Sequence, residues 1–476
     1  MQTRTVIAGS KVEFGTSGAR GLVLDFSSSV VFSYVYNFIK HIEKTYSFSS
    51  VAIGIDNRPS SYKMAQASAL AVLRSGYKIE FYGVLPTPAL ALHGLSSKIP
   101  SVMVTGSHIP FDRNGLKFYR PDGEITKDDE YYIRNENYNI DLVLSDLPEL
   151  CESSLASENY INRYINLFSS SFLSGKHIGV YEHSSSGRDI YAKLLKKLGA
   201  EVTSLERSDI FVPIDTEAVS QNDRKKAVAW SNKYHFDAIF STDGDGDRPL
   251  VADEKGEWLR GDILGLLAAN ALGVQAVAVP VSCNSAIEIS KLIPEIKRTK
   301  IGSPYVIEAF SSLLEVNKSV AGFEANGGFL LASDVLFNNK LLSALPTRDA
   351  ILPFLMLMYI SRDDSISQSV SALPKRFSIS DRVTNFSNDL SSGVLNILKS
   401  NSSAFLSEML SENVDVIAID YTDGIKMELS SGDYVHLRPS GNAPEFRCYV
   451  ESALMTRAES ILERVIAFLE DYKITI

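Results

Sequence analysis

The feature that most restricts the fold of this chain is a regular alternation between short apolar runs and longer amphipathic segments. Residues 50–55 (SVAIGI) are typical of a buried strand, and residues 28–45 before them have the spacing of a helix. The same alternation begins again at Lys176 and a third time near Trp258. Strands that alternate with helices predict mixed or parallel sheets covered on both faces. We therefore expect an α/β fold with three related mixed-sheet units.

The residues after about position 370 have a different pattern. Residues 376–383 and 414–419 favour strands, residues 422–437 predict a hairpin, and residues 457–473 have the spacing of a long amphipathic helix. We expect a smaller α+β unit here. The predicted domains, in chain order, are residues 1–157, 158–257, 258–370 and 371–476.

The composition argues against several classes of partner. The formal net charge of -10 argues against nucleic acid or an anionic membrane. Three widely spaced cysteines, Cys151, Cys283 and Cys448, are typical of a reducing cytoplasm. The first residues lack the apolar core of a signal peptide, and the longest apolar run, residues 351–360, contains Pro353 and is too short to cross a bilayer. We expect a cytoplasmic protein that binds neither nucleic acid nor membrane.

Residues 104–119 (VTGSHIPFDRNGLKFY) contain the first candidate site. Gly106 lets the backbone turn sharply after an apolar run, which places Ser107 beside His108 at the tip of a turn. Lys117 follows within the next apolar run. A hydroxyl on such a loop, between a histidine and a lysine, is a candidate nucleophile or phosphoryl carrier. The alternative is a turn in which these side chains only make hydrogen bonds.

A second loop, residues 242–249 (TDGDGDRP), concentrates negative charge. Asp243, Asp245 and Asp247 alternate with glycines, so the backbone can fold until their oxygens converge. Three carboxylates this close repel one another, and hard oxygen ligands suit magnesium or calcium. Arg248 is positioned to pair with a substrate oxygen or with one of the carboxylates. The alternatives are a solvated acidic turn and a structural calcium loop.

The third loop, residues 322–329 (GFEANGGF), ends an apolar run with a carboxylate, an amide and glycines. Glu324 and Asn326 have side chains that can hydrogen-bond the hydroxyls of a sugar. The alternative is a tight turn with a glutamate on the surface.

The fourth loop, residues 438–447 (RPSGNAPEFR), is rich in groups that bind anions. Guanidinium groups, a hydroxyl and backbone N–H groups that converge on fixed oxygens are what a phosphate monoester requires. The alternative is a turn with one structural arginine. The candidate donors are Arg438, Ser440, Gly441, Asn442 and Arg447.

In this order, the four loops resemble the motifs of the α-D-phosphohexomutase superfamily over essentially the whole chain. TGSHIP is similar to the phosphoserine loop, DGDGDR to the magnesium loop, GFEANGG to the sugar-recognition loop and RPSGNAPEFR to the phosphate-binding loop. FGTSGARG, residues 14–21, resembles the opening motif. The resemblance implies that Ser107 is phosphorylated, that Arg20 and Lys117 lie at the active site, and that four domains surround a central cleft, with the last one mobile.

The resemblance further implies a mutase that moves a phosphoryl group between positions 1 and 6 of a hexose phosphate. Ser107 donates its phosphoryl group, the bisphosphate reorients while bound, and the other phosphoryl group returns to Ser107. Either His108 or Lys117 moves the proton, and Arg20, Lys117 and Arg248 neutralise charge. The implied cofactors are one Mg²⁺ per chain and hexose 1,6-bisphosphate as activator. The implied metal ligands are Ser107, Asp243, Asp245 and Asp247.

The sugar loop departs from the family pattern. Members that act on acetylglucosamine phosphate read Glu-Ala-Asn-Gly-His, whereas Gly328 stands in place of the histidine here, and Ser303 stands where some members have another histidine. The RPSGNAPEFR form is similar to that of phosphomannomutases and favours mannose phosphate over glucosamine or glucose phosphate. The alternatives are a catalytically silent sugar-phosphate-binding relative and a phosphatase. We expect a monomer or a homodimer.

Overall fold

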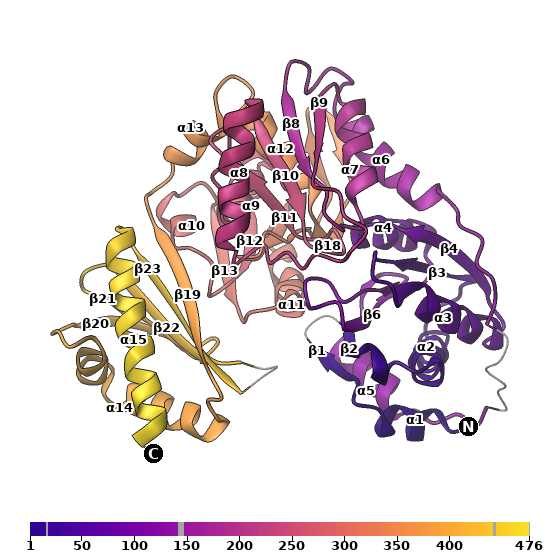
Figure 1. The fold of residues 1–476 in the computed structure, drawn as a ribbon, viewed down its shortest axis with the longest axis horizontal. Helices are drawn as coiled ribbons and strands as arrows, with labels where there is room; N and C mark the ends of the chain where they lie inside the picture. Colours follow the sequence, from indigo (N-terminus) through magenta and orange to yellow (C-terminus); the bar gives the residue numbers. More distant parts are fainter. Residues whose placement is uncertain (16–17, 141–146, 441–443, 476) are drawn as a thin grey trace.

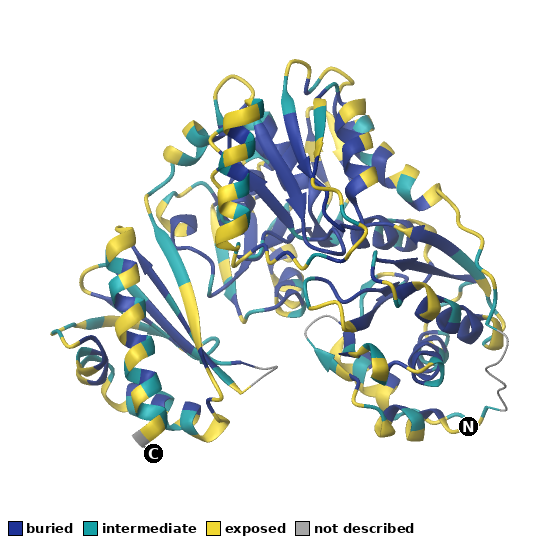
Figure 2. Cartoon of the chain, in the orientation of Figure 1, coloured by how far each residue is buried: buried dark blue, intermediate teal, exposed yellow. Residues whose placement is uncertain are grey.

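The computed structural model describes residues 1–15, 18–140, 147–440 and 444–475. These residues form an arch in which the C-terminal segment and the N-terminal unit stand opposite each other, joined by the middle of the chain (Figure 1). Sheets form the buried interior, and the helices that cover them expose their outer faces (Figure 2). The mixed-sheet α/β architecture predicted from the sequence is confirmed.

The first sheet has the strand order β1-β2-β6-β5-β3-β4, with β7 paired to β6. β3 is parallel to β4 and β5, and its residues are all buried, as a central strand covered on both faces requires. Because β3 and β5 are parallel, the loops that follow them, residues 56–60 and 105–112, lie at the same edge of the sheet. The strands are β1 Glu13–Gly15, β2 Gly18–Leu22, β3 Ser50–Ile55, β4 Lys78–Val84, β5 Ser101–Val104, β6 Arg113–Arg120 and β7 Gly123–Glu124. The helices are α1 Thr3–Gly9, α2 Ser28–Ile42, α3 Ser61–Arg74, α4 Thr87–Ser97 and α5 Lys127–Asn135.

The second sheet has the order β11-β10-β8-β9, in which only the β10–β11 pair is antiparallel. The turn between β10 and β11 is the acidic loop, so its position is fixed by the two strands that it joins. The strands are β8 His177–Tyr181, β9 Glu201–Leu205, β10 Ala238–Thr242 and β11 Pro249–Ala252. The helices are α6 Leu155–Leu167, α7 Arg188–Lys197 and α8 Gln221–Tyr234.

The third sheet has the order β13-β12-β14-β15-β18, and β16 and β17 form a separate hairpin. The strands are β12 Ala276–Pro280, β13 Glu295–Thr299, β14 Val320–Phe323, β15 Phe329–Leu331, β16 Val335–Phe337, β17 Lys340–Leu342 and β18 Leu345–Asp349. The helices are α9 Gly261–Leu272, α10 Ala286–Ile289, α11 Ser303–Leu314, α12 Ile351–Ile360 and α13 Ile366–Ser371.

Helix α12 is the longest apolar run of the sequence and is almost entirely buried. Pro353 does not interrupt it, because this residue lies in the first turn, where the backbone N–H has no partner within a helix. Its Phe354 packs against Phe240 of the second sheet, with ring centroids 4.8 Å apart. The second and third sheets therefore share one core. Within the described ranges, no helix is both long enough and apolar enough to cross a membrane.

The fourth sheet is antiparallel throughout, in the order β19-β23-β22-β21-β20. Its core contains only residues from the C-terminal segment, between Val383 and Leu469. One face packs on two helices, and the opposite face is turned toward the rest of the molecule (Figure 1). The strands are β19 Phe377–Thr384, β20 Val416–Asp420, β21 Ile425–Leu429, β22 Tyr434–Pro439 and β23 Glu445–Ser452. The helices are α14 Asn388–Leu410 and α15 Met455–Thr475.

Candidate active site

Ser107 is fully buried just beyond β5, in a left-handed backbone conformation with a φ of +54°. Its backbone N–H donates to Thr105 Oγ1 at 2.8 Å, and its Oγ donates to Asp243 Oδ2 at 2.6 Å. The second bond joins loops that are 136 residues apart in the sequence. A left-handed serine is unfavourable by about 1–2 kcal/mol, so the surrounding structure must hold it. The predicted meeting of the serine loop and the acidic loop is therefore present.

The side chain that holds the serine loop is Arg58, which the sequence analysis did not single out. Its Nε pairs with Asp56 Oδ2 at 3.1 Å, and both side chains are fully buried. Its terminal nitrogens donate to backbone carbonyls along the serine loop. Those acceptors are Ser107 at 3.0 Å, Ile109 at 2.5 Å, Pro110 at 2.7 Å and Arg113 at 2.9 Å. An Asp-x-Arg sequence directly after the fully buried strand β3 is the signal that marks this pair in the sequence.

The acidic loop brings the three predicted carboxylates together. All three side chains are buried, and they offer oxygen atoms within 4.8 Å of one another. A Cβ on Gly244 would lie 2.5 Å from the Ser107 carbonyl oxygen, so only glycine allows this close approach of the two loops. Burial, together with repulsion from the other two carboxylates, raises the pKa of Asp243 well above its usual value.

Lys117 lies beneath this loop on β6, as a positive charge among the carboxylates. Its Nζ donates to Asp245 Oδ2 at 2.5 Å and to Asp247 Oδ2 at 2.7 Å. Burial lowers the pKa of Lys117, but the two carboxylates outweigh burial and raise the pKa above its ordinary value.

The donor set fits a divalent cation. The Oδ1 atoms of Asp245 and Asp247 are buried without a hydrogen-bond partner in the described part of the chain, beside the third carboxylate of Asp243. Buried polar atoms without partners are costly, and hard carboxylate oxygens are the ligands that magnesium and calcium prefer. The acidic loop therefore has the donor chemistry that a divalent metal ion requires.

Two arginines, Arg20 and Arg248, and the imidazole of His108 lie beside this cluster of carboxylates. The sequence predicts a glycine-rich loop around Arg20, but this residue lies on β2, opposite Gly115 of β6; residues 16–17 are outside the described ranges. Burial and the neighbouring Arg248 lower the pKa of Arg20 to about 10. Arg248 donates to His108 Nδ1 at 3.1 Å. Burial, with Arg248 and Arg20 nearby, lowers the pKa of His108 to about 3, so this imidazole is neutral.

The sugar loop is a tight turn at the end of β14. The Glu324 N–H donates to the Gly328 carbonyl at 3.1 Å, and Asn326 Oδ1 accepts the Gly328 N–H at 2.9 Å. The amide oxygen of Asn326 is thus used within the loop. The Glu324 carboxylate is buried and accepts from Arg348 Nε at 2.6 Å. Burial raises the pKa of Glu324, but Arg348 outweighs it and lowers the pKa below the usual value.

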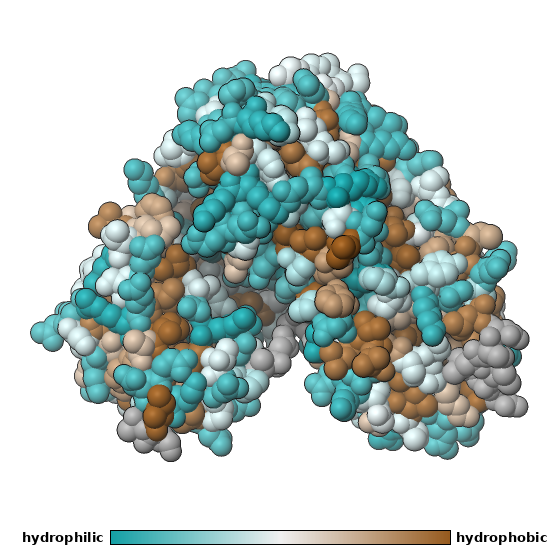
Figure 3. Space-filling model, in the orientation of Figure 1, coloured by the Kyte–Doolittle hydropathy of each residue, from teal (hydrophilic) through white to brown (hydrophobic). Residues whose placement is uncertain are grey.

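The fourth loop lies on the other side of the molecule's notch. Figure 3 shows this notch between the C-terminal segment and the N-terminal unit, and the ends of β22 and β23 at Pro439 and Glu445 point into it (Figure 1). Arg438 Nη1 lies 3.7 Å from Asp423 Oδ2, and Arg447 Nη2 lies 3.5 Å from Glu445 Oε2. Ser440 is also placed here, whereas the predicted Gly441 and Asn442 lie outside the described residues.

The register of the fourth sheet adds an arginine that the sequence analysis missed. Arg438 lies directly opposite Arg447, and Arg447 lies directly opposite Arg382 of β19. Residues directly opposite each other share a face of a sheet, so three guanidinium groups line one end of the open face. The Nε atoms of Arg438 and Arg447 are buried without a hydrogen-bond partner among the described residues. This row offers the positive charge and the donors that an anion requires, so it is a candidate anion-binding surface.

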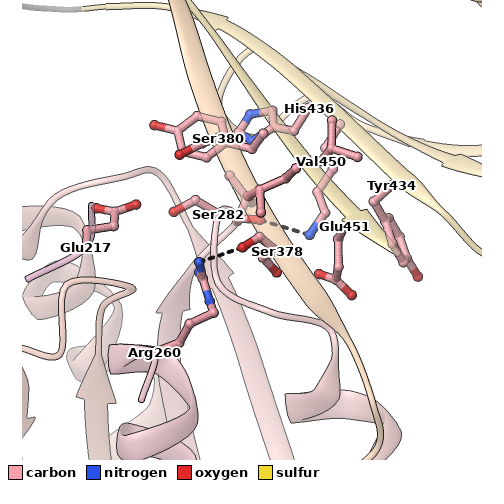
Figure 4. A pocket seen from close by; sticks show the side chains of 13 residues that line it. Glu217, Arg260, Ser282, Ser378, Ser380, Tyr434, His436, Val450 and Glu451 are labelled. Atoms are coloured by element: carbon pink, nitrogen blue, oxygen red, sulfur yellow. Dashed lines mark hydrogen bonds between the residues drawn. The ribbon is translucent and has the colours of Figure 1, made fainter. Parts of the chain in front are cut away.

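The other end of the open face contacts the middle of the chain around a small polar pocket. Figure 4 shows Arg260 pointing from the start of α9 toward Ser378 of β19, whose carbonyl accepts from it at 3.1 Å. Lys426 donates to the Val281 carbonyl at 2.9 Å. His436 is buried in the same pocket. These polar contacts hold the C-terminal segment against the middle of the chain. The row of three arginines on the same sheet faces the notch.

Comparison with known proteins identifies the family. Residues 11–142 match the family described as phosphoglucomutase/phosphomannomutase, alpha/beta/alpha domain I, and residues 158–256 match domain II of the same family. A phosphomannomutase of Salmonella muenchen is 54% identical over 98% of this chain and 97% of its own length. The chain belongs to the α-D-phosphohexomutase superfamily.

Solved structures share the fold of this phosphohexomutase. A phosphoglucomutase/phosphomannomutase family protein from Burkholderia thailandensis has a TM-score of 0.72 at 18% identity, over 96% of this chain and 97% of its own. An N-acetylphosphoglucosamine mutase from Aspergillus fumigatus, in complex with GlcNAc-6P and magnesium, has a TM-score of 0.59 at 15% identity, over 99% of both chains. The superfamily membership predicted from the four loops is confirmed.

Proposed function

We propose that this phosphohexomutase interconverts mannose 1-phosphate and mannose 6-phosphate through a phosphorylated Ser107. The observation that carries the proposal is the 2.6 Å hydrogen bond between Ser107 Oγ and Asp243, which places the candidate phosphoryl carrier at the metal loop. The choice of mannose phosphate is supported by the 54% identity to the Salmonella phosphomannomutase.

Phosphorylated Ser107, Asp243, Asp245 and Asp247 would hold one Mg²⁺. When bound, this ion supplies positive charge that offsets the negative charge on the oxygens of the transferring phosphoryl group. The phosphoserine adds a charge of about -1.5 to -2 to the three carboxylates, which strengthens the need for a cation. Arg20, Lys117 and Arg248 supply the remaining positive charge from the protein.

In the first half-reaction, the bond between phosphorus and Ser107 Oγ breaks as a new bond forms to a hydroxyl oxygen of the bound sugar phosphate. The proton of that hydroxyl ends on the departing Ser107 Oγ, which regains its O–H, and His108 and Lys117 are the two candidate groups to move it. For His108 Nδ1 to take part, Arg248 must leave it and turn to a substrate oxygen. The bound 1,6-bisphosphate then reorients, and its other phosphoryl group returns to Ser107.

The far phosphate of either orientation binds the fourth loop through Arg438, Ser440 and Arg447, with Gly441 and Asn442 as further predicted donors. Glu324 accepts from hydroxyls of the sugar, and Asn326, whose side chain hydrogen-bonds the Glu324 carboxylate, lies beside it. The notch in Figure 3 leaves room for closure of the C-terminal segment over the substrate, which excludes water from the phosphoserine. We propose the domains 1–157, 158–257, 258–370 and 371–476, each containing one of the larger sheets.

A coupled assay tests this proposal. The protein is incubated with Mg²⁺ and mannose, glucose or glucosamine 1-phosphate, each with a trace of its 1,6-bisphosphate, and 6-phosphate and free phosphate are measured. Faster isomerisation of mannose 1-phosphate is expected. Free phosphate alone would identify a phosphatase, a preference for glucosamine or glucose would reassign the substrate, and no turnover would identify a silent relative.

Two variants test the assigned roles in the same assay. Ser107→Ala is expected to abolish turnover without loss of the fold, while Ser169→Ala, on an exposed loop, retains full activity. Asp245→Asn is expected to raise the Mg²⁺ concentration at half-maximal rate by about tenfold or more and to weaken Mg²⁺ binding in calorimetry. Full activity of Ser107→Ala contradicts the phosphoserine assignment, and an unchanged Mg²⁺ affinity of Asp245→Asn contradicts the metal assignment.

A further inference from the structure

Arg348 of β18 fills the space that a side chain at position 328 would occupy. A Cβ built on Gly328 would lie 2.6 Å from Arg348 Cδ and 2.8 Å from Arg348 Cγ. Such distances are shorter than carbon atoms tolerate, so Arg348 in its observed position requires glycine at 328. The arginine stem occupies the volume above the sugar loop.

Arg348 is held firmly in this place. It lies on β18, is 3% exposed, and directly precedes Asp349, the last residue of this strand, which is itself anchored. The Asp349 carboxylate accepts from the hydroxyl groups of Tyr160, at 2.5 Å, and Tyr164 of helix α6. Because the backbone of β18 is fixed in this way, the guanidinium group has little freedom to move away from the sugar loop.

The guanidinium group of Arg348 contacts two acidic groups of the site. Its Nε donates to Glu324 Oε2 at 2.6 Å, and its Nη1 lies 3.9 Å from Asp247 Oδ2. The first contact is a hydrogen-bonded ion pair, and the second is longer than a hydrogen bond. Of these two contacts, the one to the sugar loop is therefore the shorter and the stronger.

We propose that Arg348 is the positioning residue of the sugar loop, holding the Glu324 carboxylate as a fixed acceptor for sugar hydroxyls, and that Gly328 is required because it leaves room for Arg348. This inference rests on the proposed function. An ionised carboxylate accepts hydrogen bonds and donates none, so the ligand chemistry it recognises is a pair of sugar hydroxyl groups.

A double-mutant cycle tests the coupling between Arg348 and Glu324. Arg348→Met and Glu324→Gln are each expected to raise the KM for mannose 1-phosphate by about tenfold or more, because each removes one partner of a charged hydrogen bond. The double variant is expected to be no worse than the poorer single variant, since both changes disrupt one contact. Arg362→Met, at an exposed arginine, is the matched control.

The Mg²⁺ dependence separates the two possible routes of action. The Mg²⁺ concentration at half-maximal rate is expected to change less than about twofold in Arg348→Met. A large shift in Mg²⁺ requirement with an unchanged sugar KM would overturn the inference, because Arg348 would then act through Asp247. Independent, multiplicative losses in the double variant would overturn it as well.

Gly328→Ala tests the packing without any change of charge. We expect it to raise the sugar KM in the wild-type background and to have little effect when Arg348 is already methionine, whose flexible side chain moves aside. Gly9→Ala, where an added Cβ meets no atom within 4 Å, is the control. Equal effects of Gly328→Ala in both backgrounds would contradict the inference.

The outcome for Arg348 is distinguishable from the outcome for the function itself. If the wild-type protein isomerises none of the three hexose phosphates, the proposed function fails before any variant is compared. If the wild type is active and Arg348→Met keeps its sugar KM, only the role of Arg348 fails. Thermal unfolding of each variant shows whether a lost activity reflects a lost fold.

Discussion

At the scale of single residues, the site depends on side chains that hydrogen-bond backbone groups and hold them in place. Arg58 gathers the carbonyl groups of the serine loop and holds Ser107 in a conformation that a serine rarely adopts. Asp56 balances its charge in a fully buried ion pair. A pair of this kind orients the candidate phosphoryl carrier Ser107, so we expect its loss to affect both activity and stability.

We predict that Arg58→Lys lowers kcat by about 100-fold, because a lysine has one terminal nitrogen and cannot span the carbonyls of the loop. Stability should also fall, by about 3 kcal/mol or more, since the buried Asp56 loses its matched partner. Kinetics and urea unfolding measure the two effects. Arg58→Met with Asp56→Asn should regain stability but not activity; wild-type kcat in either variant would contradict the prediction.

At the scale of elements, the sequence predicted the helices and strands whose residues follow a regular local pattern. β3 is the run 50–55 that was predicted as a strand, and helix α2, Ser28–Ile42, lies within the predicted helix 28–45. Helix α14 was not predicted, because its serine-rich middle breaks the apolar spacing and its backbone kinks at Asn401. β23 was hidden because its first residues belong to the phosphate motif.

The site was predictable to a similar extent. The four loops carry their chemistry in adjacent residues, so the sequence alone indicated Ser107 and the three aspartates. Arg348 was missed because its partner Glu324 lies 24 residues away, and Arg382 because its neighbour Arg447 lies opposite it only in the folded sheet. Contacts between strands distant in the sequence leave no local pattern to read.

The arginine row of β19, β23 and β22 yields a prediction for the fourth sheet. Like charges directly opposite one another repel, and a bound phosphate relieves this repulsion. Arg382→Ala is expected to raise the KM for hexose phosphates by about threefold to tenfold, with a smaller effect at high salt because Arg382 is exposed. Lys399→Ala, on the exposed surface of α14, is the control; equal KM values for both variants would exclude Arg382 from the anion surface.

At the scale of the whole molecule, the arch consists of two differently built parts. The first three sheets are tied together by shared cores and by polar links such as Tyr160 to Asp349. The C-terminal segment has a core of its own and touches the rest through polar contacts around Arg260 and Lys426. This arrangement suits a segment that closes over the notch and opens again.

The packing of the C-terminal segment around His436 is expected to become less stable in acid. His436 faces Lys426, Arg438, the Asp423 carbonyl and the Tyr449 ring; burial, with the two cations, lowers its pKa to about 4. The unfolded chain binds the proton from about pH 6.5. The stability that neutral His436 contributes is therefore complete above pH 6.5 and is lost as pH falls toward 4.

By pH 5 this single group should cost about 2 kcal/mol of unfolding free energy. Urea unfolding at pH 7.5 and pH 5 measures the loss in the wild type and in His436→Asn, whose side chain keeps a donor for the Asp423 carbonyl. Between pH 7.5 and pH 5, the unfolding free energy of the variant should fall by about 2 kcal/mol less than that of the wild type. Identical pH dependence in the two proteins would show that His436 does not titrate as expected.

Helix α12 has a consequence for how such a chain can be recombined. It belongs to the third segment in sequence, yet its Phe354 completes the interior beneath Phe240 of the second. A chimera joined near residue 257 would pair a foreign helix with this sheet and leave mismatched aromatic surfaces. Exchanges between relatives should therefore succeed when residues 158–370 move as one block, and the junction near residue 371 is the natural place to graft a different C-terminal segment.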